Sequence, residues 1–188
     1  MKTRKCKACK AEFTPSLPMQ KVCSFSCAID LTVAEKKKVQ RKGELILRRA
    51  DKVTREGQKT RSDYIKAAQT AFNLYVRTRD AKKPCICCGK PLAAESIGGG
   101  FDCGHYRSVG SAPHLRFEEN NAHGQTKQCN RWGAGRAVDY RLGLIARIGL
   151  EAVEALEADQ APRKHTVDEL KAIKKHYAEL AKQLRSQL

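Results

Sequence analysis

The spacing of apolar residues along the chain predicts three helical regions. The first spans residues 62–80, where Ser62 is a suitable N-cap and Pro84 ends the helix. Its core-facing positions recur every three or four residues, at Tyr64, Ala68, Ala71, Phe72, Tyr75 and Val76. This pattern is typical of a helix that packs one face against a core.

The second and third helical regions follow residue 130. The second has apolar positions at Val138, Leu142, Ile145, Ile148, Val153 and Leu156, and we expect it to be interrupted at Gly149. The third begins at the capping residue Thr166 and carries Val167, Leu170, Ile173, Tyr177, Leu180 and Leu184. Only short segments, such as FDCGHYRS, read as strands, so we expect a helix-rich α+β protein.

The nine cysteines of the 188 residues change this picture, because their spacing is that of metal ligands. Cys6, Cys9, Cys23 and Cys27 form C-x2-C-x13-C-x3-C, which predicts a four-cysteine zinc finger. Four buried free thiols are the alternative interpretation. The opening MKTRKCKACK lacks the apolar stretch of a signal peptide, so we expect a reducing, intracellular compartment in preference to secretion.

The chain is strongly basic, with a net charge of +17 and 37 Lys and Arg against 20 Asp and Glu. A charge of this size indicates a polyanionic partner, with nucleic acid first and an anionic membrane surface as the weaker alternative. Residues 28–61 are a solvated charged helix or linker, or else a surface that follows phosphates. The candidate DNA contacts are Lys36, Lys37, Lys38, Arg41, Lys42, Arg48, Arg49, Arg107, Arg131 and Arg136.

Residues 102–132 gather the side chains that phosphodiester hydrolysis requires. His105 supplies a base whose pKa lies near working pH, and Asn121 and Asn130 follow it. A hard ion such as Mg²⁺ or Mn²⁺ prefers oxygen ligands, and Asp102 and His123 are further candidates beside Asn130. In a regular strand Asp102 and His105 would point to opposite faces, although Gly104 permits a bulge. The alternative is a polar loop in which these residues are purely structural.

The order of these residues resembles the HNH, or ββα-metal, endonuclease family, in an H-N-N variant. The resemblance implies that His105 is the general base, that Asn121 pins the loop and that Asn130 holds the catalytic ion. It also implies a treble-clef-like core with a second zinc bound by Cys85, Cys88 and Cys129. Thr126 stands where the fourth cysteine is usual, so Cys87, Cys103 or water would complete the site, or the zinc is lost.

A wider resemblance, carried by PCICCG, DCGHYRS, APHLRFEENNAHGQ and QCNRWGAGRAVDYRLGLIARIGLEAVEALE, is to the NinG (Rap) family of phage recombination endonucleases. It implies cutting of branched DNA such as D-loops and Holliday junctions, in the host cytoplasm and without a membrane partner. A homodimer and recombination proteins are further partners to consider. A non-catalytic zinc-finger protein, or a nuclease for RNA or linear duplex, is the competing interpretation.

The expected organisation has four parts. Residues 1–30 form the finger, residues 31–61 a basic helical linker, residues 62–160 the nuclease core with flanking helices, and residues 161–188 a C-terminal helix.

Overall fold

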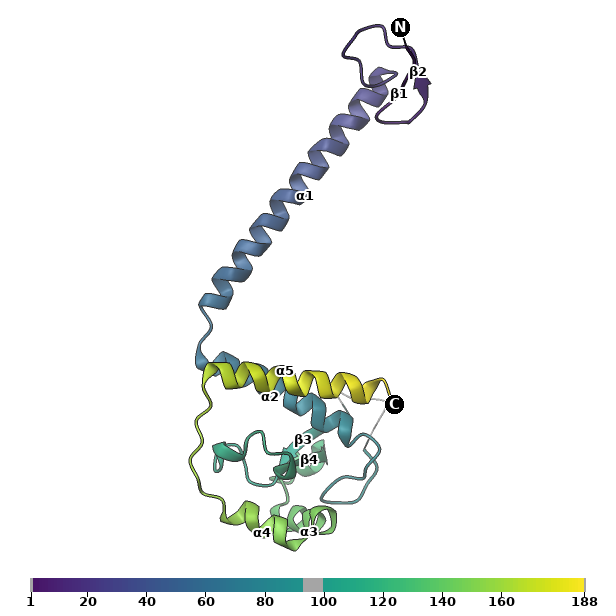
Figure 1. The fold of residues 1–188 in the computed structure, drawn as a ribbon. Helices are drawn as coiled ribbons and strands as arrows, with labels where there is room; N and C mark the ends of the chain where they lie inside the picture. Colours follow the sequence, from purple (N-terminus) through teal and green to yellow (C-terminus); the bar gives the residue numbers. More distant parts are fainter. Residues whose placement is uncertain (1, 93–99, 188) are drawn as a thin grey trace. The chain divides into compact units, whose positions relative to one another are not determined.

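The computed structural model describes residues 2–92 and 100–187, and the chain divides into two compact units, Met1–Gln58 and Lys59–Leu188. Figure 1 shows their elements, which are mainly helices with two small sheets. The predicted helix-rich α+β class is therefore confirmed at this level. Among the described residues, no helix is both long and apolar enough to cross a bilayer.

The first unit consists of a small sheet followed by one long helix. Strand β1 (Arg4–Lys5) pairs antiparallel with β2 (Glu12–Phe13), and helix α1 spans Phe25–Gly57. Ser24 caps α1, since its side chain accepts from the backbone N–H of Cys27. The helix starts inside the predicted finger and continues through Gly43, so no structural boundary falls near residue 30. A solvent-facing glycine costs a helix only about 1 kcal/mol relative to alanine, which α1 tolerates.

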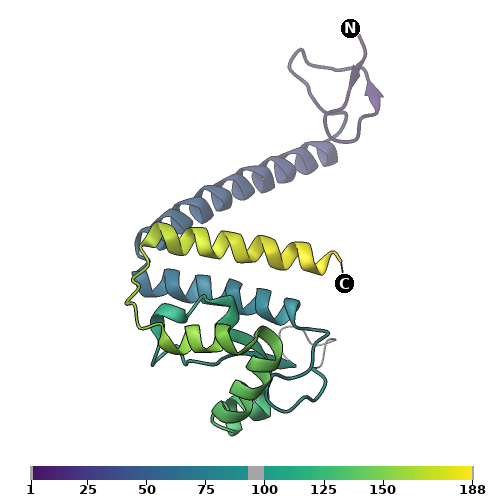
Figure 2. The same ribbon diagram turned by 60° about the horizontal axis from the view of Figure 1, so that its bottom comes forward.

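The second unit is built on two helices, α2 (Arg61–Arg79) and α5 (Val167–Arg185), which lie side by side (Figures 1 and 2). Their N-terminal ends meet where Arg61 Nε donates to the carbonyl of His165 at 3.0 Å. Phe72 of α2 packs edge-on against Tyr177 of α5, with ring centroids 4.8 Å apart. The predicted core face of α2 is thus largely confirmed.

Both helices begin with a capping box, in which the cap side chain and the third helical residue satisfy each other's backbone N–H. Thr166 caps α5 as predicted, with Glu169 as its partner. For α2 the prediction of Ser62 is wrong: Thr60 is the cap and Asp63 the reciprocal acceptor. The pair Thr60–Asp63 completes two hydrogen bonds, whereas Ser62 lies inside the first turn.

A two-stranded sheet follows along the chain. Strand β3 (Phe101–His105) pairs antiparallel with β4 (Ala122–Thr126), and the register is continuous from Phe101 opposite Thr126 to His105 opposite Ala122. Short turns η2 (Pro113–Leu115) and η3 (Glu119–Asn121) lie in the connection. After β4 comes η4 (Gln128–Trp132), a five-residue π-helix. The sheet therefore leads directly into a short helical segment.

Helices α3 (Ala137–Ile148) and α4 (Leu150–Ala158) meet at Gly149, the break that the sequence predicts. Ile145 and Ile148 of α3 pack against the core as predicted. The predicted inner face of α3 is wrong at Val138 and Leu142, which are 76% and 62% exposed, and Tyr140 and Leu144 are buried instead. The cause is a close approach to the loop below, since a Cβ on Gly143 would lie 1.8 Å from the carbonyl oxygen of Ile86.

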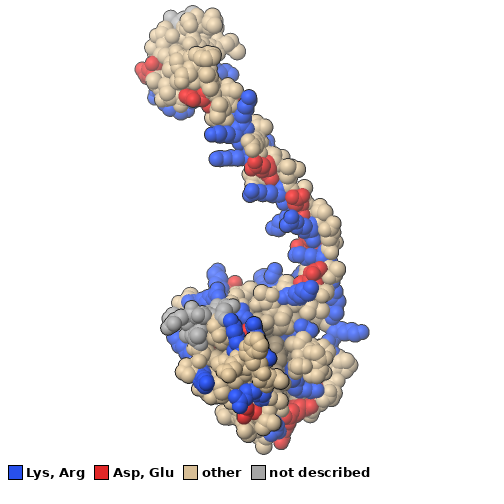
Figure 3. All heavy atoms as spheres, turned by 180° about the vertical axis from the view of Figure 1, so that it is seen from behind, with Lys and Arg blue, Asp and Glu red and all other residues tan. Residues whose placement is uncertain are grey.

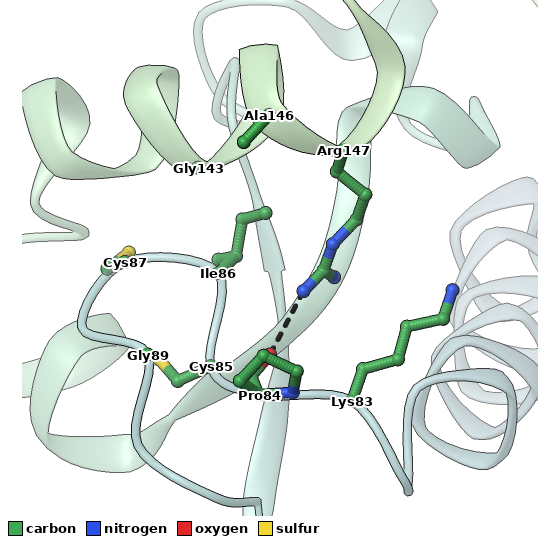
Figure 4. A pocket seen from close by; sticks show the side chains of 9 residues that line it. All are labelled: Lys83, Pro84, Cys85, Ile86, Cys87, Gly89, Gly143, Ala146 and Arg147. Atoms are coloured by element: carbon green, nitrogen blue, oxygen red, sulfur yellow. Dashed lines mark hydrogen bonds between the residues drawn. The ribbon is translucent and has the colours of Figure 1, made fainter.

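That approach brings α3 onto the cysteine knuckle at residues 85–88. Figure 4 shows Gly143 above Ile86, and Arg147 reaching from α3 toward Pro84. Arg147 Nη2 donates to the carbonyl of Pro84 at 3.0 Å. Tyr140, in the first turn of the helix, donates from its hydroxyl to the carbonyl of Gly104 in β3 at 2.9 Å. Helix α3 therefore fixes both the knuckle and the strand that carries His105.

Candidate active site and metal centres

The four N-terminal cysteines converge as their spacing predicts. The thiol sulfurs of Cys6, Cys9, Cys23 and Cys27 all lie within 4.8 Å of one another. The backbone N–H of Cys23 donates to Cys6 Sγ at 3.4 Å. Burial raises the pKa of the Cys6 thiol, but backbone N–H groups, first that of Cys9, outweigh it and bring the pKa to about 6. Such a set of four sulfurs could hold a tetrahedral Zn²⁺.

A second cluster joins Cys85 and Cys88 of the knuckle to Cys129 of η4, again with all sulfurs within 4.8 Å. The backbone N–H of Thr126 donates to Cys85 Sγ at 3.4 Å. Burial raises the pKa of Cys85, but this bond and the N–H groups of the knuckle outweigh it and bring the pKa to about 7. These three sulfurs could also bind zinc, with one coordination position left to another ligand.

Thr126 is beside that position. Its hydroxyl oxygen lies 3.8 Å from Cys85 Sγ and accepts from the backbone N–H of Cys129 at 3.3 Å. The alternatives Cys87 and Cys103 are not in the cluster. Cys87 Sγ instead contacts Gln125 Nε2 at 2.8 Å. Of the ligands predicted to replace the fourth cysteine, only water remains. The Thr126 hydroxyl is a further oxygen close to the three sulfurs.

His105 stands at the end of β3 with one nitrogen engaged. Its Nε2 is 3.1 Å from the carbonyl oxygen of Arg116. Because a carbonyl only accepts, this hydrogen bond requires a proton on Nε2 and leaves Nδ1 as the unprotonated nitrogen of the neutral ring. Burial lowers the pKa of His105 below its ordinary value and outweighs the opposite effect of the Arg116 carbonyl. The imidazole is thus neutral at neutral pH.

Asn121 is fully buried, and its side chain forms hydrogen bonds with the backbone of the segment that connects β3 to β4. Its Oδ1 accepts from the backbone N–H of Arg107 at 2.8 Å, and its Nδ2 donates to the carbonyls of Arg107 and Leu115 at 3.0 and 3.1 Å. All three contacts hold segments that flank His105 and its partner Arg116. Asn121 therefore fixes the backbone around the histidine.

His105 and Asn130 meet at one cavity of about 410 Å³, which Cys103, Tyr106 and Gly135 also line. Asn130 Nδ2 donates to Asp102 Oδ2 at 3.0 Å, and Arg131 holds both oxygens of Asp102 at 2.8 and 2.9 Å. The register of β3 with β4 is unbroken, so the bulge that could have turned Asp102 toward His105 is not formed. Asp102 is therefore linked to this cavity through its hydrogen bond with Asn130.

His123, the other candidate ligand, lies in a buried ionic network and not in that cavity. Its Nδ1 is 3.7 Å from Asp80 Oδ2, and its Nε2 is 3.2 Å from the carbonyl of Asn120. Arg79 and Arg147 also contact Asp80 Oδ2, at 2.9 and 3.6 Å. Sequence reasoning missed this network, because its members come from three separate elements and share no motif.

The predicted DNA contacts differ in how free their side chains are. Arg107 is occupied inside the protein, where its guanidinium donates to the carbonyls of Leu156 and Asp159 at 2.9 and 2.6 Å. It therefore holds the end of α4. Arg136 pairs with Asp139 at 2.7 Å but stays half exposed. Figure 3 shows the Lys and Arg side chains of α1 facing solvent, with acidic side chains among them.

The fold and these sites define a helix-rich α+β protein with a four-cysteine and a three-cysteine cluster, each of which could bind zinc. The chain belongs to the NinG family, because the family described as Bacteriophage Lambda NinG protein matches residues 1–187. Protein ninG of Escherichia phage lambda is 38% identical over 196 residues, 97% of this chain and 94% of that protein. Those of Salmonella phage P22 and Escherichia phage 933W are also 38% identical, with the same coverage. No solved structure matches the chain.

Proposed function

We propose that this protein is a metal-dependent endonuclease with an HNH-like core that cuts branched DNA. The observation that carries the proposal is the meeting of His105 and Asn130 at one cavity, although they are 25 positions apart in the chain. A base and an oxygen ligand for a hard cation are the two groups that hydrolysis of a phosphodiester requires from the protein.

In the proposed reaction His105 removes a proton from the water that attacks phosphorus. Nε2 is committed to the Arg116 carbonyl, so Nδ1 takes the proton. The lowered pKa of the ring keeps it unprotonated before the reaction. As the new P–O bond forms, the bond to the 3′ oxygen breaks, and the products are a 5′ phosphate and a 3′ hydroxyl. Asn121 acts on the backbone and not on the substrate.

The side-chain oxygens of Asn130 and Asp102 suit Mg²⁺ or Mn²⁺ because both are hard donors, and the two side chains are joined by the hydrogen bond from Asn130 Nδ2 to Asp102 Oδ2 at 3.0 Å. When bound, the ion neutralises charge on the phosphate and on the departing oxygen. For Asp102 to bind the ion, Arg131 would have to release one of the two Asp102 oxygens. The Arg131 side chain is 58% exposed, so it can move into solvent. So few protein ligands imply weak binding of the ion without DNA.

The substrate class rests on the NinG family and on charge. A net charge of +17 favours a polyanion. The exposed basic side chains of α1 would contact phosphates without reading sequence. Branched DNA is thus the proposed partner, and recombination proteins or a second copy of the chain are further proposals with weaker support.

The test is a substrate panel. Zinc-loaded protein is incubated with a D-loop, a Holliday junction, a linear duplex and RNA, each with Mg²⁺, with Mn²⁺ or with chelator. The proposal expects metal-dependent cutting of the branched DNA above the other substrates. Asn130→Ala should lose activity that high Mn²⁺ partly restores, because it removes a metal ligand and not the base. Binding of all substrates without cutting would favour a non-catalytic zinc-finger protein, and preferred cutting of RNA would overturn the substrate assignment.

A further inference from the structure

Trp132 is the one tryptophan in the sequence, and it is 84% exposed. It ends the π-helix η4 and borders a cavity of about 360 Å³. Cys88 and Cys129 of the three-cysteine cluster border the same cavity, together with Lys90, Gln128, Gly133 and Arg136. An exposed indole does not stabilise the fold by burial, so its position beside two cations calls for an external partner.

The two cations lie at the cavity in different ways. Lys90 is exposed on the turn after the knuckle. Arg136 lies with its side-chain stem across Gly133, since a Cβ on that glycine would be 2.9 Å from Arg136 Cγ. The half-exposed Arg136 guanidinium pairs through Nε with Asp139 and also interacts with the Cys129 thiol, so it contributes positive charge to the cavity while it is tied to both residues. The cavity thus combines a flat aromatic surface with positive charge.

The backbone of this segment is held in unusual conformations. A π-helix spans Gln128–Trp132, and Ala134 and Arg136 both have left-handed φ angles, 49° and 48°. A left-handed residue other than glycine costs roughly 1–2 kcal/mol, and such conformations and π-turns concentrate at functional sites.

Both cavities share this segment. Asn130, Ala134, Gly135 and Ala137 border the cavity of His105, and Gln128, Cys129, Trp132, Gly133 and Arg136 border that of Trp132. A nucleotide bound beside Trp132 would therefore lie next to the phosphate presented to His105.

We infer that the Trp132 cavity binds one unpaired nucleotide, with its base stacked on the indole and its phosphate held by Arg136 and Lys90. The inference rests on the proposed function and gives it a structural basis for preferring branched DNA. Paired bases bury both faces in the duplex stack, whereas a base at a branch or in a single strand can stack on an aromatic side chain. An acidic peptide is the competing occupant, which the charges alone would also attract.

The test uses the fluorescence of Trp132, which no other tryptophan obscures. Titration of the full zinc-loaded chain with oligothymidylate should quench it, and a duplex of equal length should quench it much less. Trp132→Ala should weaken binding of the single strand roughly five- to hundredfold, the effect of one base stacking on an aromatic side chain, and leave duplex binding unchanged. Trp132→Phe should retain most of the affinity.

Two controls separate the cavity from general charge. Val138→Ala removes a side chain that is 76% exposed just beyond the segment and should leave single-strand affinity unchanged. Lys90→Gln should lower the salt dependence of single-strand binding by about 0.7 units of slope. Equal affinity of wild type and Trp132→Ala for the single strand, or quenching by polyglutamate as strong as by oligothymidylate, would overturn the inference. Binding does not depend on cutting, so quenching without metal-dependent cleavage would refute the nuclease and leave this site standing.

Discussion

Asp80 offers the sharpest test of how the second unit holds its candidate site in place. Its side chain is fully buried, and Gly124 N, Arg79 Nη2 and Arg79 Nε approach its oxygens at 2.8, 2.9 and 2.9 Å. Lys83, Arg147 and His123 lie within 3.2 to 3.7 Å of the carboxylate. The carboxylate therefore joins the end of α2 to β4 and α3.

Asp80→Asn keeps the shape of the side chain and removes its charge. Loss of one partner from a buried ion pair costs about 3–5 kcal/mol, because the remaining charge is left without compensation. The Arg79 side chain is 18% exposed, which allows water to compensate part of its charge, so we expect a loss near the lower end of this range. Urea unfolding followed by circular dichroism measures the change in the free energy of unfolding of the second unit.

The same variant has a defined pH dependence. Burial raises the pKa of Asp80, but the neighbouring His123 and Arg79 and the backbone N–H of Gly124 outweigh it and hold the pKa far below the ordinary value. A carboxylate with a depressed folded-state pKa stabilises the protein at pH values above its unfolded-state pKa of about 4. This stabilisation is lost progressively as the pH falls below that value. The gap between wild type and Asp80→Asn should therefore be constant from roughly pH 5 to 8 and shrink below about pH 4.

Asp168→Asn is the matched control, since Asp168 pairs with Lys171 on the surface of α5 and its side chain is 93% exposed. It should leave the unfolding midpoint nearly unchanged because solvent screens such pairs. If Asp80→Asn is as mild as this control, the buried network does not hold the sheet and the reasoning fails.

Three further predictions concern the metal, the charge and the base. Thr126→Cys should raise zinc affinity in a chelator competition, because it adds a thiolate beside Cys85; unchanged affinity would mean that residue 126 does not face the ion. Replacing Lys36, Lys37 and Lys38 by Gln should lower the salt slope of DNA binding by up to about three, and an unchanged slope would make α1 a solvated helix. Burial lowers the pKa of His105, so the cleavage rate should reach half its maximum below about pH 6.5 and then level off; a midpoint above pH 7 would contradict this role.

Local sequence spacing predicted the four-cysteine cluster and the Cys85–Cys88 pair, because a C-x2-C pair brings two sulfurs together within one turn. The third member of the second cluster, Cys129, came from the family resemblance. Local spacing also predicted the core face of α2 and the break at Gly149, both of which depend on neighbouring residues alone. The inner face of α3 was not predictable in this way. Its rotation toward Tyr140 depends on the contact between Gly143 and Ile86, residues 57 positions apart.

Candidate site residues show the same limit. The order of His105, Asn121 and Asn130 indicated the chemistry, but the partner of His105 is a backbone carbonyl, which no side-chain pattern encodes. Arg107 and His123 looked available from sequence, yet both are used inside the fold. Trp132 could have been singled out from the sequence. It follows Arg131 and the candidate metal ligand Asn130 in a polar stretch, where a core residue is not expected.

The central claim is that His105 is the base of a nuclease, and the most direct test is its removal. Single-turnover cutting of branched DNA is measured for wild type and His105→Ala at saturating protein, with DNA affinity measured on the same substrate without divalent metal. The rate should fall by roughly two to four orders of magnitude while affinity is unchanged, and no added metal should restore it. A variant that cuts within tenfold of wild type would contradict the account.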